Sequence, residues 1–521
     1  MNHIFFKIKW VVIFFCAVVT HYSVAQRKII EKNSTISLRN QGTIFNEQKL
    51  VGYYQFYEFQ KIDNDNTEYL VKILDDNLNE VFSEKFIEFR IFELKEVSFN
   101  NQSFLFKFDS NSFTIGSRRF YIYDQSKKLR RVEFPNGKHE KLWNNQQLVN
   151  LPDNINKSLY SIPDKGFLHF GNIKPKTLLI SLIDSKGAVL WENEEPDGKN
   201  EYRTVHVLAT HKTKIVCLKN VISDYSAYNS QFGNNITQYM TVYDLQTGKK
   251  EKEVKLEDEN YKYQVLSNQI NTNSTEEILG VFYGKNEKID NAHAQGLFSA
   301  NISSDGILTN IKRSIHSDYL RKSLPVANYK TEEEIKSLYF HKVFRVKDKI
   351  FAVAENFWLQ NNTGKLALRI IGANTSMYDF TMKDVFIFRL NNDFTFEKLD
   401  VFEKEKNKFN LPAGYGVFGL PKLANIVKRD NAFDYLFTQI DENENQFIIN
   451  YRSAEKEGEV DTYNVKSIIY NGGTFSNDMI RLNTEESILL VPMPAKFGNV
   501  LLSGYIKGEK RIEMRIEKIN Y

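Results

Sequence analysis

The sequence predicts an all-β protein, namely a β-propeller of seven or eight four-stranded blades with one short helix in an insertion between blades. Three observations carry this prediction: a hairpin pattern recurs along the chain, further strand patterns precede each copy, and the composition suits strands. The chain has 521 residues, of which 14% are aromatic and only 10 are proline. Aromatic side chains are enriched in strands, so we expect an ordinary β-rich globular core.

The clearest copy of the hairpin covers residues 177–191. Its first strand is apolar on both faces, which is typical of a strand that is covered on both sides. Asp184 and Gly187 then bound a tight turn. An aspartate can accept hydrogen bonds from the backbone ahead of it, and a glycine adopts the positive φ that such turns need.

Similar hairpins occur along the whole chain, and we align them at their turns. Successive turns are 49 to 88 residues apart, and a unit that recurs at unequal intervals predicts a repeat architecture with loop insertions. Asp441 is an alternative to Glu455 in the seventh copy. The predicted turns lie near Asp75, Asp124, Asp184, Asp244, Ser303, Asn391, Glu455 and Lys507.

One or two further strand patterns precede each hairpin, for example residues 204–208 and 214–218 before the turn at Asp244. About four strands per unit is the composition of a propeller blade. A string of separate sandwich domains is the alternative, but it would need linkers. Residues 511–519 alternate charged and apolar side chains, so we expect them to form an outermost strand whose edge is protected by charge.

The predicted helix lies in the longest insertion, between the fifth and sixth hairpins. Thr331 and Glu334 form a capping box, and Ile335 and Leu338 follow at helical spacing.

The N-terminus has the pattern of a signal peptide. Lys7 and Lys9 precede a short apolar run, and small residues at positions 23 and 25 suit cleavage after Ala25. We therefore expect a signal peptide at residues 1–25 and a single propeller domain at 26–521. The apolar run is too short for a comfortable membrane span, although an uncleaved anchor is the alternative. The predicted location is the periplasm, the cell surface or the extracellular space.

With this architecture and this N-terminus, the chain resembles an uncharacterised family of secreted bacterial β-propeller proteins. The resemblance covers nearly all of residues 26–521. No blade carries the Trp-Asp signature of WD40 repeats, so the subfamily stays open.

Charge and cysteine content exclude two classes of protein. Removal of the two lysines in residues 1–25 would lower the formal charge from +4 to +2, which gives no electrostatic case for nucleic-acid binding. Cys217 would then be the sole cysteine, so no internal disulfide can form. Its apolar neighbours favour a buried, inert thiol.

Three motifs resemble ligand sites but lack essential features. Residues 414–419 match the dinucleotide pattern G-x-G-x-x-G, yet Pro412 and Pro421 flank them and argue against the required helix. Residues 63–67 and 441–445 resemble calcium loops without the required glycine and glutamate, so we expect polar turns. His206 and His211 are five residues apart and would face opposite sides of a strand. We predict no catalytic residue, metal or cofactor.

The long loops are the predicted binding surface. In propellers, as the resemblance implies, the loops between second and third strands open on the same face as the loops between blades. In this chain those loops are long and carry aromatic residues among small polar ones, which suits binding, although such residues can also pack their own loop. The candidate binding residues are Tyr225, Tyr228, Phe232, His293, Trp358 and Tyr378.

The expected function is a non-enzymatic binding or scaffold module of the bacterial cell envelope, with a protein, peptide or glycan as partner. A hydrolase or lyase acting on glycans or peptides is an alternative, and it would need paired carboxylates in the central funnel. A purely structural envelope protein is the other alternative.

Overall fold

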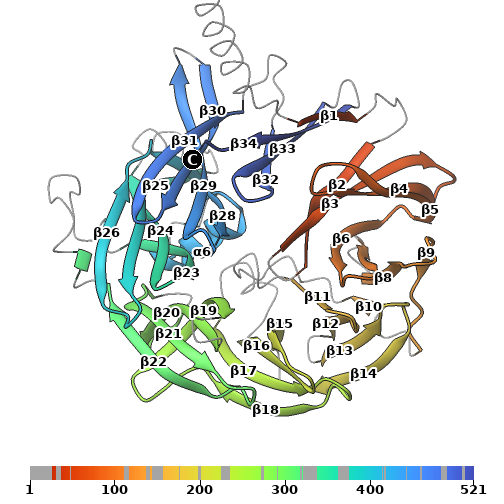
Figure 1. Ribbon diagram of the computed structural model, residues 1–521, viewed down its shortest axis with the longest axis horizontal. Helices are drawn as coiled ribbons and strands as arrows, with labels where there is room; N and C mark the ends of the chain where they lie inside the picture. Colours follow the sequence, from red (N-terminus) through yellow and green to blue (C-terminus); the bar gives the residue numbers. More distant parts are fainter. Residues whose placement is uncertain are drawn as a thin grey trace, which may run out of the picture.

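The computed structural model confirms the propeller and gives eight blades (Figure 1). It describes these residues: 26–30, 37–46, 49–110, 116–135, 141–142, 157–174, 177–196, 201–223, 235–270, 275–289, 292–316, 319–320, 337–361, 375–412, 415, 418–441, 443–457, 460–482, 490–506 and 511–520.

The first four blades occupy the N-terminal half of the chain. Blade 1 contains β2 (Ser37–Asn46), β3 (Lys49–Lys61), β4 (Asn66–Asp75) and β5 (Glu80–Phe89). Blade 2 contains β6 (Phe92–Phe99), β7 (Phe104–Ser110), β8 (Gly116–Tyr123), β9 (Leu129–Arg131) and the short β10 (Lys141–Leu142). Blade 3 contains β11 (Leu159–Ile162), β12 (Gly166–Lys174), β13 (Thr177–Asp184) and β14 (Val189–Pro196). Blade 4 contains β15 (Tyr202–Thr210), β16 (Lys214–Ser223), β17 (Asn235–Asp244) and β18 (Lys250–Lys255).

The other four blades follow in chain order. Blade 5 contains β19 (Tyr261–Ile270), β20 (Glu276–Gly284), β21 (Gly296–Ile302) and β22 (Leu308–Ile315). Blade 6 contains β23 (Leu338–Val346), β24 (Lys349–Asn361), β25 (Thr375–Asn391), β26 (Phe396–Phe402) and an extra strand β27 (Asn407–Pro412). Blade 7 contains β28 (Tyr435–Asp441), β29 (Gln446–Glu457), β30 (Val460–Asn471) and β31 (Thr474–Arg481). Blade 8 contains β32 (Val491–Pro494), β33 (Asn499–Ile506), β34 (Arg511–Lys518) and β1 (Gln26–Ile30).

Within each blade, consecutive strands pair antiparallel, from the first strand at the centre to the last at the rim (Figure 1). Neighbouring blades pack face to face, and each interface has its own cluster of buried apolar side chains. Tyr53 of blade 1 and Leu501 of blade 8, for example, belong to one cluster, and both are fully buried. The eight blades therefore form a closed ring.

The N-terminal strand completes the last blade. β1 pairs antiparallel with β34, and Gln26 lies opposite Ile516. The sequence-based expectation that residues 511–519 form an outermost strand is therefore wrong, because β34 is the third strand and β1 covers its edge.

The hairpin turns confirm the repeat in six of the eight copies. Asp184 Oδ1 accepts hydrogen bonds from the backbone N–H groups of Lys186 and Ala188, each at 2.8 Å. Gly187 follows with φ 88°. The prediction of a turn at Glu455 is wrong, since Glu455 lies within β29. The alternative, Asp441, ends β28 and precedes β29, whereas the predicted turn should precede β31, the last strand of the blade. The matching turn of blade 7 is at residues 471–474, and Lys507 lies outside the described residues, between β33 and β34.

Helix α6 (Leu420–Arg429) lies between blades 6 and 7. One short helix between blades was expected, but in the insertion between the fifth and sixth hairpins. It begins directly after Gly419, with Pro421 in its first turn. The interpretation of Pro421 as evidence against a helix was wrong, because proline is well tolerated in a first turn, where backbone N–H groups have no partner within the helix. Thr331, Glu334 and Ile335 lie outside the described residues, whereas Leu338 begins β23.

Candidate functional site

A pocket opens on the long-loop face between blades 5 and 6, beside α6. It has about 500 Å³ of empty volume, which includes the part open to solvent. Blade 5 contributes β19, the ends of β20 and the loop before β21, while blade 6 contributes the start of β23. Its lining residues are Gln264, Leu266, Val281, Tyr283, Ile289, Ala292, His293, Ala294, Leu338, Tyr339, Phe340, Phe357, Pro421, Ala424 and Asn425.

The helix forms one wall of this pocket because of its own amphipathic pattern. Leu423, Ile426 and Val427 are fully buried against Phe357 and Phe380 of blade 6. This packing places Ala424 and Asn425 at the pocket. Ala424 has a small side chain, which leaves room between the helix and the blade. The pocket therefore depends on both α6 and blade 6.

Among the described residues that line it, none is an aspartate, glutamate, lysine or arginine. Its polar groups are neutral amides, tyrosine hydroxyls and one imidazole. The hydroxyl of Tyr283 donates a hydrogen bond of 2.7 Å to Gln264 Oε1, which fixes that wall. Pockets of this kind, mostly apolar with a few polar groups, bind uncharged apolar groups and orient them through hydrogen bonds.

Of the six predicted binding residues, the structure places one, His293, in this pocket. His293 is half-buried in the loop between β20 and β21. Its neighbour His316 is buried, and burial together with the charge of His293 lowers the pKa of His316 to about 4. His316 is therefore neutral at physiological pH. Its ring packs beside the pocket, edge-on to the ring of Phe340, with 5.6 Å between the two ring centroids.

The remaining predicted residues are not brought to the pocket. Trp358 is half-buried on β24, and the Lys406 ammonium lies 5.7 Å from the centre of its ring. Tyr378, on β25, packs at the edge of the apolar cluster under α6. Both residues belong to strands of blade 6, and their role in binding stays a prediction. Tyr225, Tyr228 and Phe232 lie outside the described residues.

Sequence reasoning missed the pocket residues from α6, β19 and β23. The apolar residues Leu423, Ile426 and Val427 have helical spacing after Pro421, and this pattern could have revealed the helix. The 414–419 motif still does not make a dinucleotide site. The preceding strand, β27, pairs antiparallel with β25 and is not part of a parallel strand–helix–strand unit.

The two calcium-like segments are turns in the described chain. Asp63 Oδ1 accepts hydrogen bonds from the backbone N–H groups of Asp65 and Asn66, at 2.8 and 2.7 Å. Asp441 accepts similar bonds from Asn443 and Glu444. Among the described residues, no three histidine, cysteine or acidic side chains gather as a metal site would require.

Cys217 is fully buried, as expected, and burial raises the pKa of its thiol far above the ordinary value. A thiol that stays protonated is a poor nucleophile.

A histidine and two carboxylates do come together, but in the interface of blades 6 and 7. His341 Nε2 lies 2.9 Å from Glu355 Oε2, and Lys404 pairs with both Glu355 and Asp434. Burial opposes the ionisation of Glu355, but Lys404 and His341 outweigh it and lower its pKa to about 2. These side chains are at most 5% exposed, so a substrate cannot reach them. They stabilise the interface.

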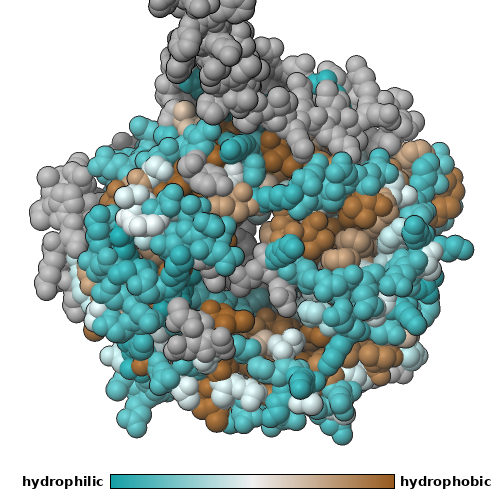
Figure 2. All heavy atoms as spheres, in the orientation of Figure 1, coloured by the Kyte–Doolittle hydropathy of each residue, from teal (hydrophilic) through white to brown (hydrophobic). Residues whose placement is uncertain are grey.

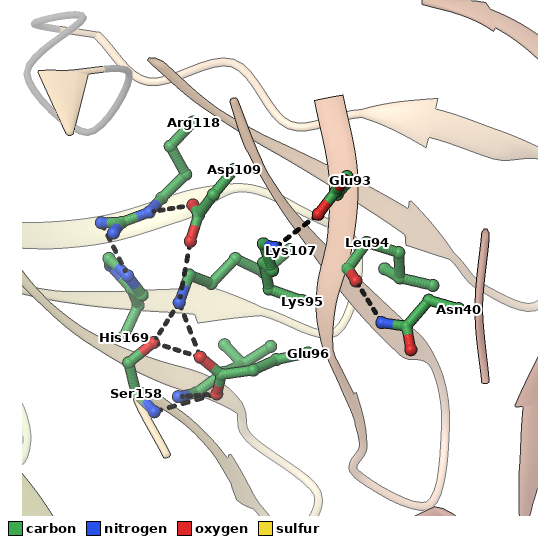
Figure 3. Close-up of polar contacts among 11 residues, drawn as sticks. Asn40, Glu93, Leu94, Lys95, Glu96, Lys107, Asp109, Arg118, Ser158 and His169 are labelled. Atoms are coloured by element: carbon green, nitrogen blue, oxygen red, sulfur yellow. Dashed lines mark hydrogen bonds and ion pairs between the residues drawn. The ribbon is translucent and has the colours of Figure 1, made fainter. Parts of the chain in front are cut away.

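A second buried cluster joins blades 2 and 3 (Figure 3). Lys107 Nζ lies 2.6 Å from both Glu96 Oε1 and Ser158 Oγ, and Arg118 bonds Asp109 at 2.9 Å. A serine beside a lysine can be a nucleophile with its base. Here Lys107 is ion-paired with Glu96 and its side chain is 3% exposed, so a substrate cannot reach it.

No helix among the described residues is long and apolar enough to cross a membrane. A search of curated proteins found no match.

Similar solved structures include peptidase propellers. The β-propeller domain of the Trilobed protease from Pyrococcus furiosus is 11% identical, with a TM-score of 0.33 over 87% of this chain and 96% of that one. Prolyl oligopeptidase B from Galerina marginata is 9% identical, with a TM-score of 0.36 over 90% of this chain and 55% of that one. At such low similarity, the eight blades themselves establish the fold.

A family model matches residues 6–520, which is nearly the whole chain. The chain therefore belongs to the family of unknown function DUF6770.

Proposed function

We propose that the protein is a non-enzymatic binding module of the cell envelope, and that the pocket beside α6 holds an apolar side chain of a peptide or protein partner. The observation that carries the proposal is the lining of this pocket, which combines aromatic and aliphatic walls with amide, tyrosine and imidazole groups; its described residues include no aspartate, glutamate, lysine or arginine. General acid–base hydrolysis would need carboxylates there.

A peptide suits this pocket better than a glycan. The walls from Leu266, Val281 and Phe340 favour burial of an aliphatic or aromatic group. Gln264 and Asn425 offer amides that can bond a peptide backbone. The rigid blades on either side hold these groups in place, so binding needs little ordering of the protein.

The test is selection of binding peptides from a random library, followed by measurement of affinity for two matched variants. Ala292→Trp fills the pocket, and we expect it to weaken binding at least tenfold. Ala188→Trp is the control, since Ala188 is an exposed alanine in a short turn on the opposite face. Peptides that bind both variants equally, or a glycan array that yields ligands when the peptide library yields none, would contradict the proposal.

We also propose that the protein is exported, on the basis of the N-terminal pattern of residues 1–25. Cleavage after Ala25 would leave Gln26, the first residue of β1, as the new N-terminus. N-terminal sequencing of protein from the cell envelope fraction should begin at Gln26. Protein that keeps residues 1–25 and stays in the cytoplasm would show the proposal to be wrong.

A further inference from the structure

Blade 1 carries an unusual group of exposed apolar side chains at its outer rim. Ile62, Ile87, Phe89 and Ile91 are 47, 57, 46 and 41% exposed, and they account for a third of the twelve large apolar side chains exposed in the described chain. The backbone brings them together, because Phe89 lies opposite Asn66 in the β4–β5 pairing. Figure 2 shows hydrophobic residues at the rim over β4 and β5.

The group lies on the outermost strand of the blade. β5 is the last strand of its sheet, so its outer backbone groups face away from the described strands. Such edges are normally protected from pairing by charged side chains. β18 of blade 4 follows this rule, since its exposed side chains are Lys250, Glu251, Glu253 and Lys255. β5 exposes two charged side chains, Glu80 and Lys85, but it also exposes Val81, Ile87 and Phe89.

We propose that this apolar rim of blade 1 is a dimer interface, in which β5 pairs antiparallel with β5 of a second copy of the chain. The two copies would be related by a two-fold axis, and their four-stranded sheets would form one continuous sheet. Apolar rims of this kind mark protein interaction sites, and a shared edge satisfies the outer backbone groups of both strands.

Among registers whose two-fold axis lies between Glu84 and Glu88, the charges favour one. A two-fold axis at Glu84, Lys85 or Glu88 would place a residue opposite its own copy and so bring like charges together, and an axis at Phe86 would oppose Glu84 to Glu88. With the axis at Ile87, Ile87 faces its own copy and Lys85 faces Phe89. The same register places Glu84 opposite Arg90, the first residue of the turn after β5, on both sides of the axis. Opposite charges in facing positions stabilise a strand pair, whereas like charges destabilise it.

The proposal is tested by sedimentation velocity on the purified protein across the micromolar range. We expect a reversible dimer. Ile87→Lys, which places two ammonium groups together at the axis, should raise the dimer dissociation constant at least tenfold. Ile270→Lys is the control: Ile270 is 65% exposed at the end of β19, and the variant should dimerise normally.

A charge exchange tests the register. Glu84→Arg should weaken the dimer, and Glu84→Arg combined with Arg90→Glu should restore it. A wild-type protein that stays monomeric, a dimer that survives Ile87→Lys, or a double variant as weak as Glu84→Arg would overturn the proposal. Because the rim and the pocket lie on different blades, peptide binding can succeed or fail independently of this result.

Discussion

At the scale of single residues, the hairpin turns of several blades share one position with a positive φ angle. In blades 3 and 5 the fourth residue of the turn has positive φ, namely Gly187 at 88° and Gly306 at 69°, whereas in blade 4 the fifth residue, Gly248, takes this role at 68°. Leu78, Lys127 and Phe394 adopt the same conformation at 67, 57 and 73°. A side chain at such φ costs about 1–2 kcal/mol, and only glycine avoids this cost.

Substitutions at this position should therefore change stability in opposite directions. Lys127→Gly removes the strain but adds freedom to the unfolded chain, so we expect a gain of up to about 1 kcal/mol in the free energy of unfolding. Gly187→Ala should lose about 1–2 kcal/mol, because its Cβ would also lie 2.9 Å from Ile122 Cγ2. Urea unfolding measures both. A loss for Lys127→Gly together with no change for Gly187→Ala would contradict this explanation.

Turn chemistry was predictable from the sequence because it is local. Asp75, Asp124, Asp184 and Asp244 were identified as turn residues, and each accepts hydrogen bonds from its own turn. Blade 7 was misassigned because its turn begins with Asn471 and uses Gly472 and Gly473, while Glu455 lies in the polar second half of the 12-residue strand β29.

At the scale of strands, buried ion pairs connect neighbouring blades. Between blades 3 and 4, Glu195 at the end of β14 accepts bonds from Lys219 at 2.8 Å and Lys250 at 2.7 Å. The hydroxyl of Tyr243 adds a hydrogen bond of 2.9 Å. Burial opposes ionisation of Glu195, but these lysines outweigh it and lower its pKa to about 2.

This pairing should make stability depend on pH. Because the folded-state pKa of Glu195 lies below its ordinary value of 4.5, folding favours the ionised form. The stabilisation, about 3 kcal/mol, is complete above pH 4.5 and is lost as the pH falls toward 2. We expect Glu195→Gln to be less stable than wild type near pH 6, and the difference to shrink on acidification.

Thermal unfolding of both proteins between pH 6 and pH 2 measures this effect. Glu133→Gln is the control, since the side chain of Glu133 is 80% exposed and the substitution should have no pH-dependent effect. A constant difference between Glu195→Gln and wild type across this range would show that the ion pair does not stabilise the fold.

The strands were largely predictable from the sequence, but their partners were not. Lys219 lies in the apolar run of β16, where a lysine predicts either an exposed face or a buried partner. One partner, Glu253, lies on β18 of the same blade, but the other, Glu195, belongs to another blade, and local sequence cannot reveal it. The helix α6 was missed for a different reason, because Pro421 was interpreted without its position in a first turn.

At the scale of the whole molecule, the closed ring depends on contacts between the ends of the chain. β1 completes blade 8 by pairing with β34, almost 500 residues away. Such a pairing has no local signature, so the sequence favoured β34 as the outermost strand. The pairing gives the eighth blade its fourth strand.

The pocket is also a property of the whole ring. Its walls come from blade 5, blade 6 and the helix between blades 6 and 7, and sequence analysis predicted only His293 among its residues. The expectation of a binding surface on the long-loop face included the loop of His293, which lines this pocket; that the loop binds a partner stays a prediction. The residues that shape the pocket are buried strand positions, which look like ordinary core in the sequence.

The most direct test of the proposed binding role is a crystal structure of the protein with a peptide selected from the library. The proposal predicts that one apolar side chain of the peptide enters the pocket between His293 and Ala424, with its backbone near Gln264 or Asn425. A peptide bound on any other part of the propeller, with the pocket beside α6 empty, would contradict it.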